Sequence, residues 1–348
     1  MTIRDGVLLY LEENKNKAVS GEEMAEKLSC TRAAIGKAVN ELRSAGYAIF
    51  AVNKVGYTLT YSGDTLMQPM VREKLNENLR DFHMECMESV DSTNSYLKRL
   101  VAAGEKRDMA VVAASQTAGR GRRGRSFYSP VGSGLYMSFL LHPKCSAEDA
   151  VMLTTVAAVA EAMAIEEVTG EKAEIKWVND LVIRHRKVSG ILTEASTSME
   201  DGGLDYCIVG IGINLYDPDA GWPDDISAVA GSVTGITLKE ASDAGKRRDI
   251  SRYENLKNNF SAALINRFME FYSAFPNTSY LSEYEKRCFC IGKRVKILTS
   301  DHEEMENDAV HDRSHALVLG INDHCHLHLR YDDGYEEYLS SGEISIRL

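Results

Sequence analysis

The feature that most restricts the fold of this chain is a segment that carries four arginines within six residues. It reads QTAGRGRRGR over residues 116–125 and lies between two apolar, strand-like runs. Like charges that crowd together repel one another, and interspersed glycines weaken both helices and strands. The segment is therefore predicted to form a loop between two strands, with an anion beside it that compensates the positive charge.

Two familiar interpretations of this loop fit the sequence less well. Gly119, Gly121 and Gly124 match the GxGxxG pattern of dinucleotide-binding folds, but the SFYSP that follows cannot open a helix cleanly. An RNA-binding arginine and glycine tract is disfavoured because the segment occurs once, not as a low-complexity repeat. We therefore expect a flexible loop that closes over an anionic ligand, the alternative being a solvated basic surface loop.

Two more segments predict polar groups near such a loop. DSTN, residues 91–94, ends a strand and begins a helix, so it offers side chains and free amides at a helix N-terminus. The strand over 173–177 alternates, with Glu174 and Lys176 on one face, and turns at residues 178–180 into the next strand. A lysine that faces a closed site neutralises a phosphate or carboxylate, whereas one at a sheet edge extends into solvent.

The first sixty residues differ from the rest of the chain in charge and pattern. They hold eight lysines and arginines against seven aspartates and glutamates, a net charge of +1. Because the whole chain has a net charge of −11, the other 288 residues have a net charge of −12. Ser20 and Glu23 are predicted to form a capping box for a helix through residue 28. Thr31 is predicted to cap a second helix over 32–45, whose apolar stripe is Ile35, Val39 and Leu42. With strands over 48–52 and 56–59, this pattern predicts a winged helix-turn-helix.

The second of these helices presents polar side chains opposite its apolar stripe. Arginine and lysine bind phosphates, and asparagine can read base edges, so the face suits a DNA major groove. The residues predicted to contact DNA are Thr31, Arg32, Lys37 and Asn40, with Lys54 in the turn between the strands. The alternative is a packing module whose charges are only solvated.

Composition narrows the class of protein. A length of 348 residues suits two or three domains, and 44% hydrophobic with 26% charged residues excludes wholesale disorder. The longest apolar run, residues 151–165, is interrupted by Glu161, so no membrane span is predicted. Seven scattered cysteines and the lack of a signal-peptide pattern predict a cytoplasmic protein with reduced thiols.

The sequence predicts no metal site. Cys288 and Cys290 have no second cysteine pair, which disfavours zinc. His324, His326 and His328 alternate with apolar residues, which predicts one face of a barrel strand, and a metal held by the three imidazoles is the alternative.

Six motifs together resemble those of the biotin protein ligases. In family order they are VDSTN (90–94), SQTAGRGRRGR (115–125), KWVNDL (176–181), KVSGILTE (187–194), GIGIN (210–214) and GEISIR (342–347). The segment TRAAIGKAVNELRSAGY, residues 31–47, resembles the DNA-reading helix of the members that also repress the biotin operon. The resemblance covers almost the whole chain and extends to the bifunctional type, both ligase and repressor.

The resemblance implies a reaction in two steps. Biotin and Mg-ATP give biotinyl-5'-AMP and pyrophosphate, and a lysine amine on a carboxylase carrier domain then takes the biotinyl group. The implied cofactors are ATP and Mg²⁺, with biotin as substrate. The implied partners are the biotin carboxyl carrier protein domain, operator DNA and a second copy of the chain, in a homodimer for which the adenylate is the corepressor.

The same resemblance implies site residues. Lys176 would act on the oxygens shared by biotin and the α-phosphate, and Arg120 and Arg122 would order the loop over the adenylate. The implied biotin-binding residues are Ser92, Thr93, Asn94, Gln116, Arg120, Gly121, Arg122 and Lys176, and the nucleotide-binding ones are Arg120, Arg122, Asn214, Lys296, Glu343 and Arg347. The run at 126–128 is SFY where the family has Lys-Trp-Phe or a similar run, so the aromatic packing beside biotin is expected to differ.

The implied fold is α+β. We expect a winged helix-turn-helix domain at 1–62, a linker at 63–80, a catalytic domain at 81–280 and an SH3-like barrel at 281–348. The catalytic domain would hold a mixed sheet with flanking helices, related to class II aminoacyl-tRNA synthetases. Periodicity supports it independently, since Ser146 is predicted to cap an apolar helix and a second apolar stripe runs over 256–271.

Three rival functions remain on sequence alone. One is a DNA-binding repressor that senses biotin without ligating it, and another is a ligase whose N-terminal domain no longer reads DNA. A relative of the lipoate ligases would share the fold, but the glycine and arginine loop favours biotin.

Overall fold

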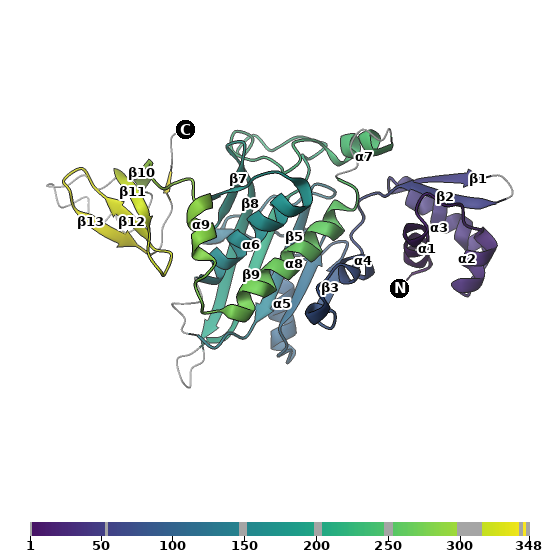
Figure 1. Ribbon diagram of the computed structural model, residues 1–348, viewed down its shortest axis with the longest axis horizontal. Helices are drawn as coiled ribbons and strands as arrows, with labels where there is room; N and C mark the ends of the chain where they lie inside the picture. Colours follow the sequence, from purple (N-terminus) through teal and green to yellow (C-terminus); the bar gives the residue numbers. More distant parts are fainter. Residues whose placement is uncertain are drawn as a thin grey trace.

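The computed structural model describes residues 2–52, 55–145, 152–197, 204–246, 253–297, 315–340 and 344–345. A helical domain and a small antiparallel sheet lie at opposite ends of a larger central domain (Figure 1). The α+β class and the winged helix-turn-helix at the N-terminus are therefore confirmed. The four domain limits themselves stay predictions.

The N-terminal domain packs three helices against a strand pair. Its elements are α1 (Ile3–Glu13), α2 (Gly21–Lys27), α3 (Arg32–Ser44), β1 (Ala48–Val52) and β2 (Gly56–Tyr61). Thr31 caps α3 as predicted, its hydroxyl accepting from the Ala34 amide at 3.2 Å. The predicted apolar stripe of α3 is fully buried, so the helix is oriented with its polar face outward.

The capping box predicted at the start of α2 is wrong. The Ser20 hydroxyl accepts from the Glu22 amide at 3.1 Å, and the Glu23 carboxylate instead accepts a hydrogen bond from the Tyr10 hydroxyl of α1. A capping box does form at α1, where Thr2 and Asp5 exchange bonds of 3.1 and 3.2 Å. The Glu23 carboxylate therefore bonds to Tyr10 of another helix, whereas the local sequence pattern predicted a bond to the start of its own helix.

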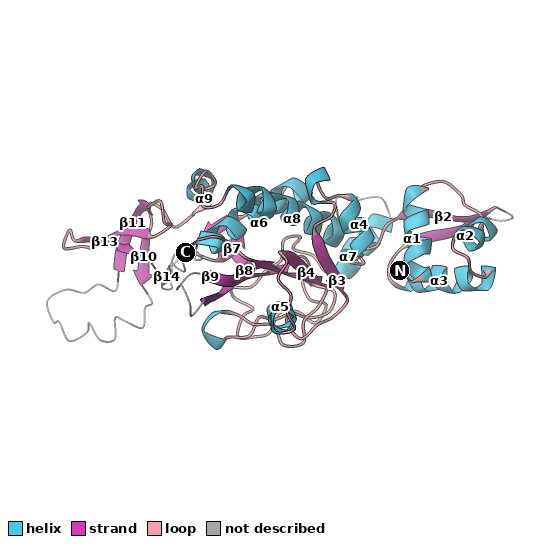
Figure 2. Ribbon diagram, turned by 90° about the horizontal axis from the view of Figure 1, so that it is seen from below, coloured by secondary structure: helices cyan, strands magenta, loops and turns pink. Residues whose placement is uncertain are grey.

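The central domain is built on a seven-stranded mixed sheet. Its order is β3-β4-β5-β9-β8-β7-β6, with only β3 and β4 parallel. The strands are β3 (His83–Met87), β4 (Met109–Ala113), β5 (Gly134–Leu141), β6 (Glu174–Lys176), β7 (Asp180–Ile183), β8 (Arg186–Thr197) and β9 (Leu204–Asn214). All eight residues of β5 are buried, because helices cover one face and α5 with the loops covers the other (Figure 2).

Two long helices pack side by side on one face of this sheet. They are α6 (Met152–Thr169) and α8 (Leu256–Ala274), and the Phe268 ring of α8 stacks on Phe139 of β5 at 4.1 Å between centroids. The predicted helix cap Ser146 lies outside the described residues. The other helices are α4 (Gln68–Glu73), α5 (Thr93–Ala102), α7 (Leu238–Lys246) and α9 (Leu281–Arg287), with a 3-10 turn at Glu77–Leu79. None of the described helices combines the length and apolar character needed to cross a bilayer.

The segment predicted as a linker packs against α8. Asp64 and Lys257 form a buried ion pair, with the Lys257 amide donating to the Asp64 carboxylate at 2.7 Å. The Asn258 side chain accepts from the Met67 amide and donates to the Thr65 carbonyl, both at 2.8 Å. These bonds hold the chain that leaves the N-terminal domain, so this stretch is anchored along its length.

The C-terminal domain is a five-stranded antiparallel sheet of order β13-β12-β11-β10-β14. Its strands are β10 (Arg294–Ile297), β11 (His315–Ile321), β12 (Leu327–Arg330), β13 (Glu336–Leu339) and β14 (Ile344–Ser345). The Trp177 indole after β6 donates to the Cys325 carbonyl at 2.8 Å and joins this sheet to the central domain.

The prediction that three histidines share one strand face is wrong. Only His328 lies in β12, where its ring approaches the Glu336 carboxylate at 2.8 Å. Cys325 has a φ of 59°, and the Asn322 side chain accepts from the amides of His324 and His326, so these residues form a turn.

Glu161 of α6 is a carboxyl group buried against the sheet. Its side chain is inaccessible, and neither oxygen has a hydrogen-bond partner among the described residues. Burial raises its pKa to about 8, partly opposed by the Ser189 hydroxyl and reinforced by the charge of Asp180. The folded chain therefore holds a proton on Glu161 at neutral pH.

Replacing this carboxyl group should change how stability depends on pH. Because the folded pKa lies above the ordinary value, the stabilising effect of the bound proton is lost as pH rises from about 4.5 through 8. Glu161→Gln should therefore be more stable than wild type by about 4 kcal/mol at pH 8.5 and differ by less than about 1 kcal/mol at pH 5. Urea unfolding across this range measures the difference.

Glu167→Gln, an exposed position on the same helix, is the matched control and should follow the wild-type pH profile. Parallel profiles for wild type and Glu161→Gln would show that Glu161 is not protonated in the folded chain.

Candidate functional site

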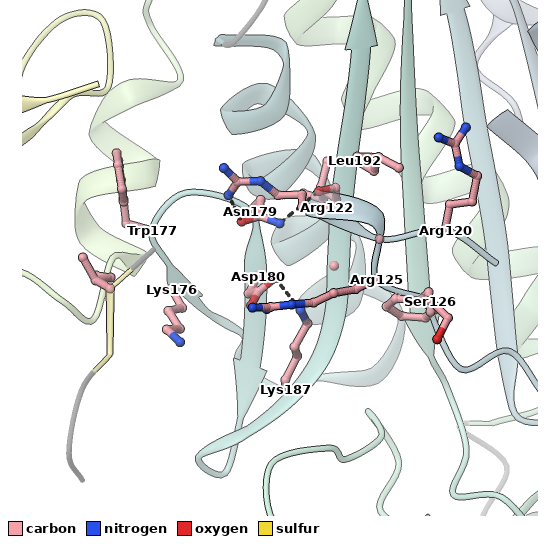
Figure 3. A pocket seen from close by; sticks show the side chains of 15 residues that line it. Arg120, Arg122, Arg125, Ser126, Lys176, Trp177, Asn179, Asp180, Lys187 and Leu192 are labelled. Atoms are coloured by element: carbon pink, nitrogen blue, oxygen red, sulfur yellow. Dashed lines mark hydrogen bonds and ion pairs between the residues drawn. The ribbon is translucent and has the colours of Figure 1, made fainter. Parts of the chain in front are cut away.

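A cavity of about 230 Å³ opens at the edge of the central sheet, between β6 to β8 and the arginine-rich loop. Five cationic side chains line it, together with five apolar ones (Figure 3). The lining residues are Arg120, Gly121, Arg122, Arg125, Ser126, Phe127, Lys176, Trp177, Asn179, Asp180, Lys187, Gly190, Ile191, Leu192 and Ile344. The predicted loop and the predicted lysine strand thus meet at one cavity, and its charge suits an anionic ligand.

The loop is held by hydrogen bonds within its own backbone. The Gly121 amide donates to the Arg125 carbonyl at 2.7 Å, and the Phe127 amide donates to the Gly119 carbonyl at 3.0 Å. A Cβ atom at position 119 would lie 2.6 Å from the carbonyl oxygen of Phe127, so only glycine fits at this position. Arg122–Gly124 forms a short 3-10 turn at the tip. The loop predicted to be flexible therefore has a defined fold in this structure.

Arg122 is fixed by the turn between β6 and β7. Its guanidinium donates to the Asn179 side-chain oxygen at 2.8 Å, and the Asn179 amide group donates to the Ile191 carbonyl of β8 at 3.0 Å. Asn179 thus links the loop to the sheet, and Figure 3 shows Arg122 extended toward it.

The two lysines of the cavity differ in their surroundings. Lys187 pairs with Asp180 at 2.6 Å across β7 and β8. Lys176, at the end of β6, has no carboxylate partner within the described part of the chain. Because an unpaired cation beside a cavity is not neutralised, Lys176 is the one available to a bound anion.

A second, smaller cavity continues from the first one. The two share Arg120, Phe127, Gly190 and Leu192, and the smaller is lined also by Ser92, Thr93, Asn94, Gln116 and the glycines of β9. Ser92 caps α5, which places Thr93 and Asn94 in the first turn of that helix. The DSTN segment and Gln116 are therefore brought together as predicted.

The polar groups of this smaller cavity form a connected network. The Gln116 side-chain oxygen accepts from the Thr93 amide at 2.9 Å, and the buried Ser138 hydroxyl lies 2.6 Å from both the Thr93 hydroxyl and the Asn94 side-chain oxygen. Glu194 of β8 accepts from the Asn94 amide group at 2.9 Å and from Lys98 at 2.8 Å. The network fixes the orientation of these side chains before any ligand binds.

Aromatic and glycine residues shape the passage between the cavities. The Phe127 ring contacts the glycine surface of β8 and β9, where a Cβ at Gly212 would lie 2.9 Å from the ring. A Cβ at Gly210 would lie 2.1 Å from the Asn94 side-chain oxygen. Side chains at these positions would displace the site residues, which explains the glycines of the GIGIN motif physically.

Several predicted site residues do not line either cavity. The Asn214 amide group donates to the Gly231 carbonyl at 3.1 Å and so supports a neighbouring loop. Lys296 lies on β10, opposite Ser345 of β14, and only the adjacent Ile344 reaches the cavity. Glu343, Arg347 and Lys54 lie outside the described residues.

Sequence reasoning assigned no role to some residues that line the cavities or bond to Asn94 in their lining. Lys187, Asn179 and Glu194 stand inside the quoted motifs, and Phe127 stands in the aromatic run, so motif position could have drawn attention to them. Ser138 had no signal, because a lone serine in an apolar strand is ordinary until its cross-sheet neighbours are known.

The outer face of α3 is a candidate nucleic-acid interface. Thr31, Arg32, Lys37 and Asn40 are all exposed, and the Lys37 side chain retains 81% of its accessibility. Arg43 on the same face donates to the Ile49 carbonyl of β1 at 2.8 Å, so it ties the helix to the wing. Four of the five predicted DNA contacts are therefore accessible, three of them on α3 and Thr31 at its N-terminus.

No group of three or more His, Cys, Asp or Glu side chains that could hold a metal ion occurs within the described ranges. Asp180 is the carboxylate on the wall of the larger cavity there, and it is paired with Lys187. The prediction that the chain itself holds no metal is not tested by this finding.

Comparison with known proteins gives two family matches. Residues 5–58 match a helix-turn-helix (HTH) domain, and residues 86–214 match the biotin/lipoate A/B protein ligase family. The bifunctional ligase/repressor BirA of Escherichia coli K12 is 30% identical over 94% of this chain and 92% of its own. BirA of Bacillus subtilis 168 is 33% identical over 70% of this chain and 74% of its own.

A solved structure shows the same fold. The biotin protein ligase from Aquifex aeolicus in complex with biotin and ATP is 27% identical, with a TM-score of 0.56 over 76% of this chain and 98% of its own. Similarity over nearly the full length, with both the helix-turn-helix and the ligase regions matched, confirms the resemblance seen in the motifs. The chain therefore belongs to the biotin protein ligase family, among the bifunctional ligase/repressors that carry an N-terminal helix-turn-helix domain.

Proposed function

We propose that this chain attaches biotin to a lysine of a carboxylase carrier domain at the expense of ATP, and that it represses transcription of biotin genes. The observation that carries the ligase is the pair of joined cavities, one lined by five cations and one lined mainly by uncharged polar groups, with Arg120 shared between them. The cationic cavity suits the phosphates of ATP, and the uncharged polar groups of the smaller one suit a small polar head group such as the ureido ring of biotin.

In the first step the biotin carboxylate attacks the α-phosphorus of ATP. A carboxyl oxygen to phosphorus bond forms, the bond to the β-phosphate oxygen breaks, and pyrophosphate leaves with its electron pair. Such a transfer needs alignment and charge neutralisation more than a covalent nucleophile on the protein. Lys176 neutralises the oxygens between the two substrates, while Arg120 and Arg122 hold the loop over the adenylate.

Polar side chains of the smaller cavity would hold biotin during this step. Ser92, Thr93, Asn94 and Gln116 bind its head group, and Gly121 lets the loop backbone approach. Asn214, Lys296, Glu343 and Arg347 are proposed to act on the nucleotide side, from outside the lining of the two cavities.

In the second step the carrier lysine attacks the acyl carbon of the adenylate as a neutral amine. The carbon to nitrogen bond forms, the bond from the acyl carbon to the phosphate oxygen breaks, AMP leaves, and the amine loses its proton to solvent. Arg122, held by Asn179, retains the adenylate until the carrier arrives.

Mg²⁺ is proposed to enter with ATP. Magnesium sites commonly combine one or two carboxylates with substrate phosphates, and Asp180 is the described carboxylate placed to contribute. The metal would reduce the negative charge on the phosphates. Lys187 would be released from Asp180 if that carboxylate turned to the metal.

Lys176→Ala should lower the rate of ATP-dependent biotin transfer to a purified carrier domain by at least about 100-fold, because it removes charge stabilisation at the reacting phosphate. The measurement follows labelled biotin on the carrier, with Mg-ATP and without ATP. Lys172→Ala, an exposed position just before β6, is the matched control and should keep wild-type activity.

Two results would contradict this assignment in different ways. Full activity in Lys176→Ala would remove the lysine from the mechanism. Biotin binding by the wild type without any transfer would favour the rival sensor that represses but does not ligate.

We propose also that α3 reads operator DNA. The support is the accessible polar face of α3 and the match to a helix-turn-helix domain. Thr31, Arg32, Lys37 and Asn40 would contact the major groove, and Lys54 in the wing would contact the backbone.

Arg32→Ala and Lys37→Ala should each weaken operator binding by about tenfold and reduce the slope of log affinity against log salt by about one unit. A salt titration of operator binding measures both quantities. Lys17→Ala, exposed in the same domain but outside α3, should bind as the wild type does. If all three variants bind equally, the domain does not read DNA through α3. That result would favour the second rival, a ligase whose N-terminal domain no longer reads DNA.

We propose finally that biotinyl-5'-AMP is the corepressor and favours a homodimer. A single helix-turn-helix contacts one half-site, so a two-fold operator requires two copies. A protein that uses ATP and meets operator DNA would act in the cytoplasm.

Sedimentation velocity should show a larger dimer fraction with biotin and Mg-ATP together than with either alone, since only the pair gives the adenylate. If biotin and Mg-ATP together do not change the dimer fraction, the adenylate is not the corepressor that favours the dimer.

A further inference from the structure

We propose that Glu194 is a positioning residue for biotin, which acts by fixing the amide of Asn94 as a hydrogen-bond acceptor toward the ligand. The inference rests on the proposed ligase function. According to this proposal, the smaller cavity selects a ligand that carries an N–H group. Glu194 determines that preference, although its side chain lines neither cavity.

Glu194 lies in β8, behind the wall of the smaller cavity. Its side chain is about one-fifth exposed, at 20%, and meets donors from two elements. One carboxylate oxygen accepts from Lys98 at 2.8 Å and approaches Arg120 at 3.2 Å, and the other accepts from the Asn94 amide group at 2.9 Å. Burial would raise the pKa of this carboxyl group, but hydrogen bonds from Lys98 and Asn94 outweigh it, and the pKa is lowered. Glu194 is therefore ionised at neutral pH and can only accept hydrogen bonds.

An acceptor on this side decides which way the Asn94 amide faces. Its nitrogen must face Glu194, and it also donates weakly to the Leu192 carbonyl at 3.4 Å, so both of its protons are used. Its oxygen lies 2.6 Å from the Ser138 hydroxyl and keeps one more lone pair for a ligand. Asn94 thus offers the cavity an acceptor and no donor, which suits the N–H of a ureido ring.

The same carboxylate holds Arg120 at the junction of the two cavities. Figure 3 shows Arg120 directed away from Arg122 and Lys176, and the Glu194 contact at 3.2 Å accounts for that direction. Exposed ion pairs contribute little, and the pair with Lys98 is of that kind because Lys98 is 39% exposed. The bond to buried Asn94 is different, since a buried amide that lost its acceptor could turn over.

Glu194→Gln keeps the size of the side chain but removes its charge. We expect the KM for biotin to rise about tenfold, because the lost bond to Asn94 affects ground-state binding of this substrate. The ion pair with Arg120 is lost as well, but the Arg120 side chain is 48% exposed and such pairs contribute little, so kcat and the KM for ATP should stay within about twofold. Lys98→Met is the matched control. It removes a partner of the same carboxylate but leaves Asn94 in place, so the KM for biotin should stay within about threefold of wild type.

A double-mutant cycle tests whether Glu194 acts through Asn94. Asn94→Ala should raise the KM for biotin, and adding Glu194→Gln to it should change that value by less than about twofold. A purely structural role would give independent, multiplying effects. It would also lower kcat and the unfolding temperature, which are measured for every variant.

Each outcome decides the proposal. An unchanged KM for biotin in Glu194→Gln, or an equal rise in Lys98→Met, would overturn it. If Glu194→Gln does not fold, Ser138→Ala tests the same orientation from the other side of the amide, and a wild-type KM there would overturn it. A wild type that transfers no biotin would instead refute the proposed function, so the two failures are distinguishable.

Discussion

Five cationic side chains surround one cavity, and their mutual repulsion is the constraint on which the site depends. The fold relieves this repulsion with internal acceptors: Asn179 holds Arg122, Asp180 holds Lys187, and Glu194 holds Arg120. The three acceptors come from the β6–β7 turn, β7 and β8, so the arginine-rich loop can dock only on a sheet with these strands in register. Lys176 remains without such a partner among the described residues, and it is the side chain that we place at the reacting phosphate.

The glycines of β8 and β9 make the smaller cavity possible. Asn94 and Phe127 pack directly on the strand backbone there, at distances that no Cβ would tolerate. One surface thereby offers a small polar cavity next to a larger cationic one, which suit the head group of a vitamin and the phosphates of a nucleotide. The helix-turn-helix domain lies at one end of the molecule, beside the central domain that holds the cavities (Figure 1). The Asp64–Lys257 pair anchors the segment that connects these two domains.

Local signals predicted the elements well where a pattern is repeated or capped. The stripe of α3 and its Thr31 cap, the alternation before Lys176 and the apolar stripe of α8 all lie in the predicted elements. Predictions that depended on competition between partners were less successful. Glu23 bonds to Tyr10 and not to the Ser20 amide, and an Asn322 turn separates the histidines that alternation placed on one strand.

The sequence by itself determined the helix-turn-helix, the basic glycine-rich loop and the polar helix start, because each depends on residues close together in the chain. It also determined the family, through motifs that keep their order. Only the tertiary structure decided which acceptor each cation meets and that Asn94 is held between Ser138 and Glu194, residues 44 and 100 positions away. Such pairings depend on strand order and register, and a pattern along one segment contains no information about which strand will lie beside it.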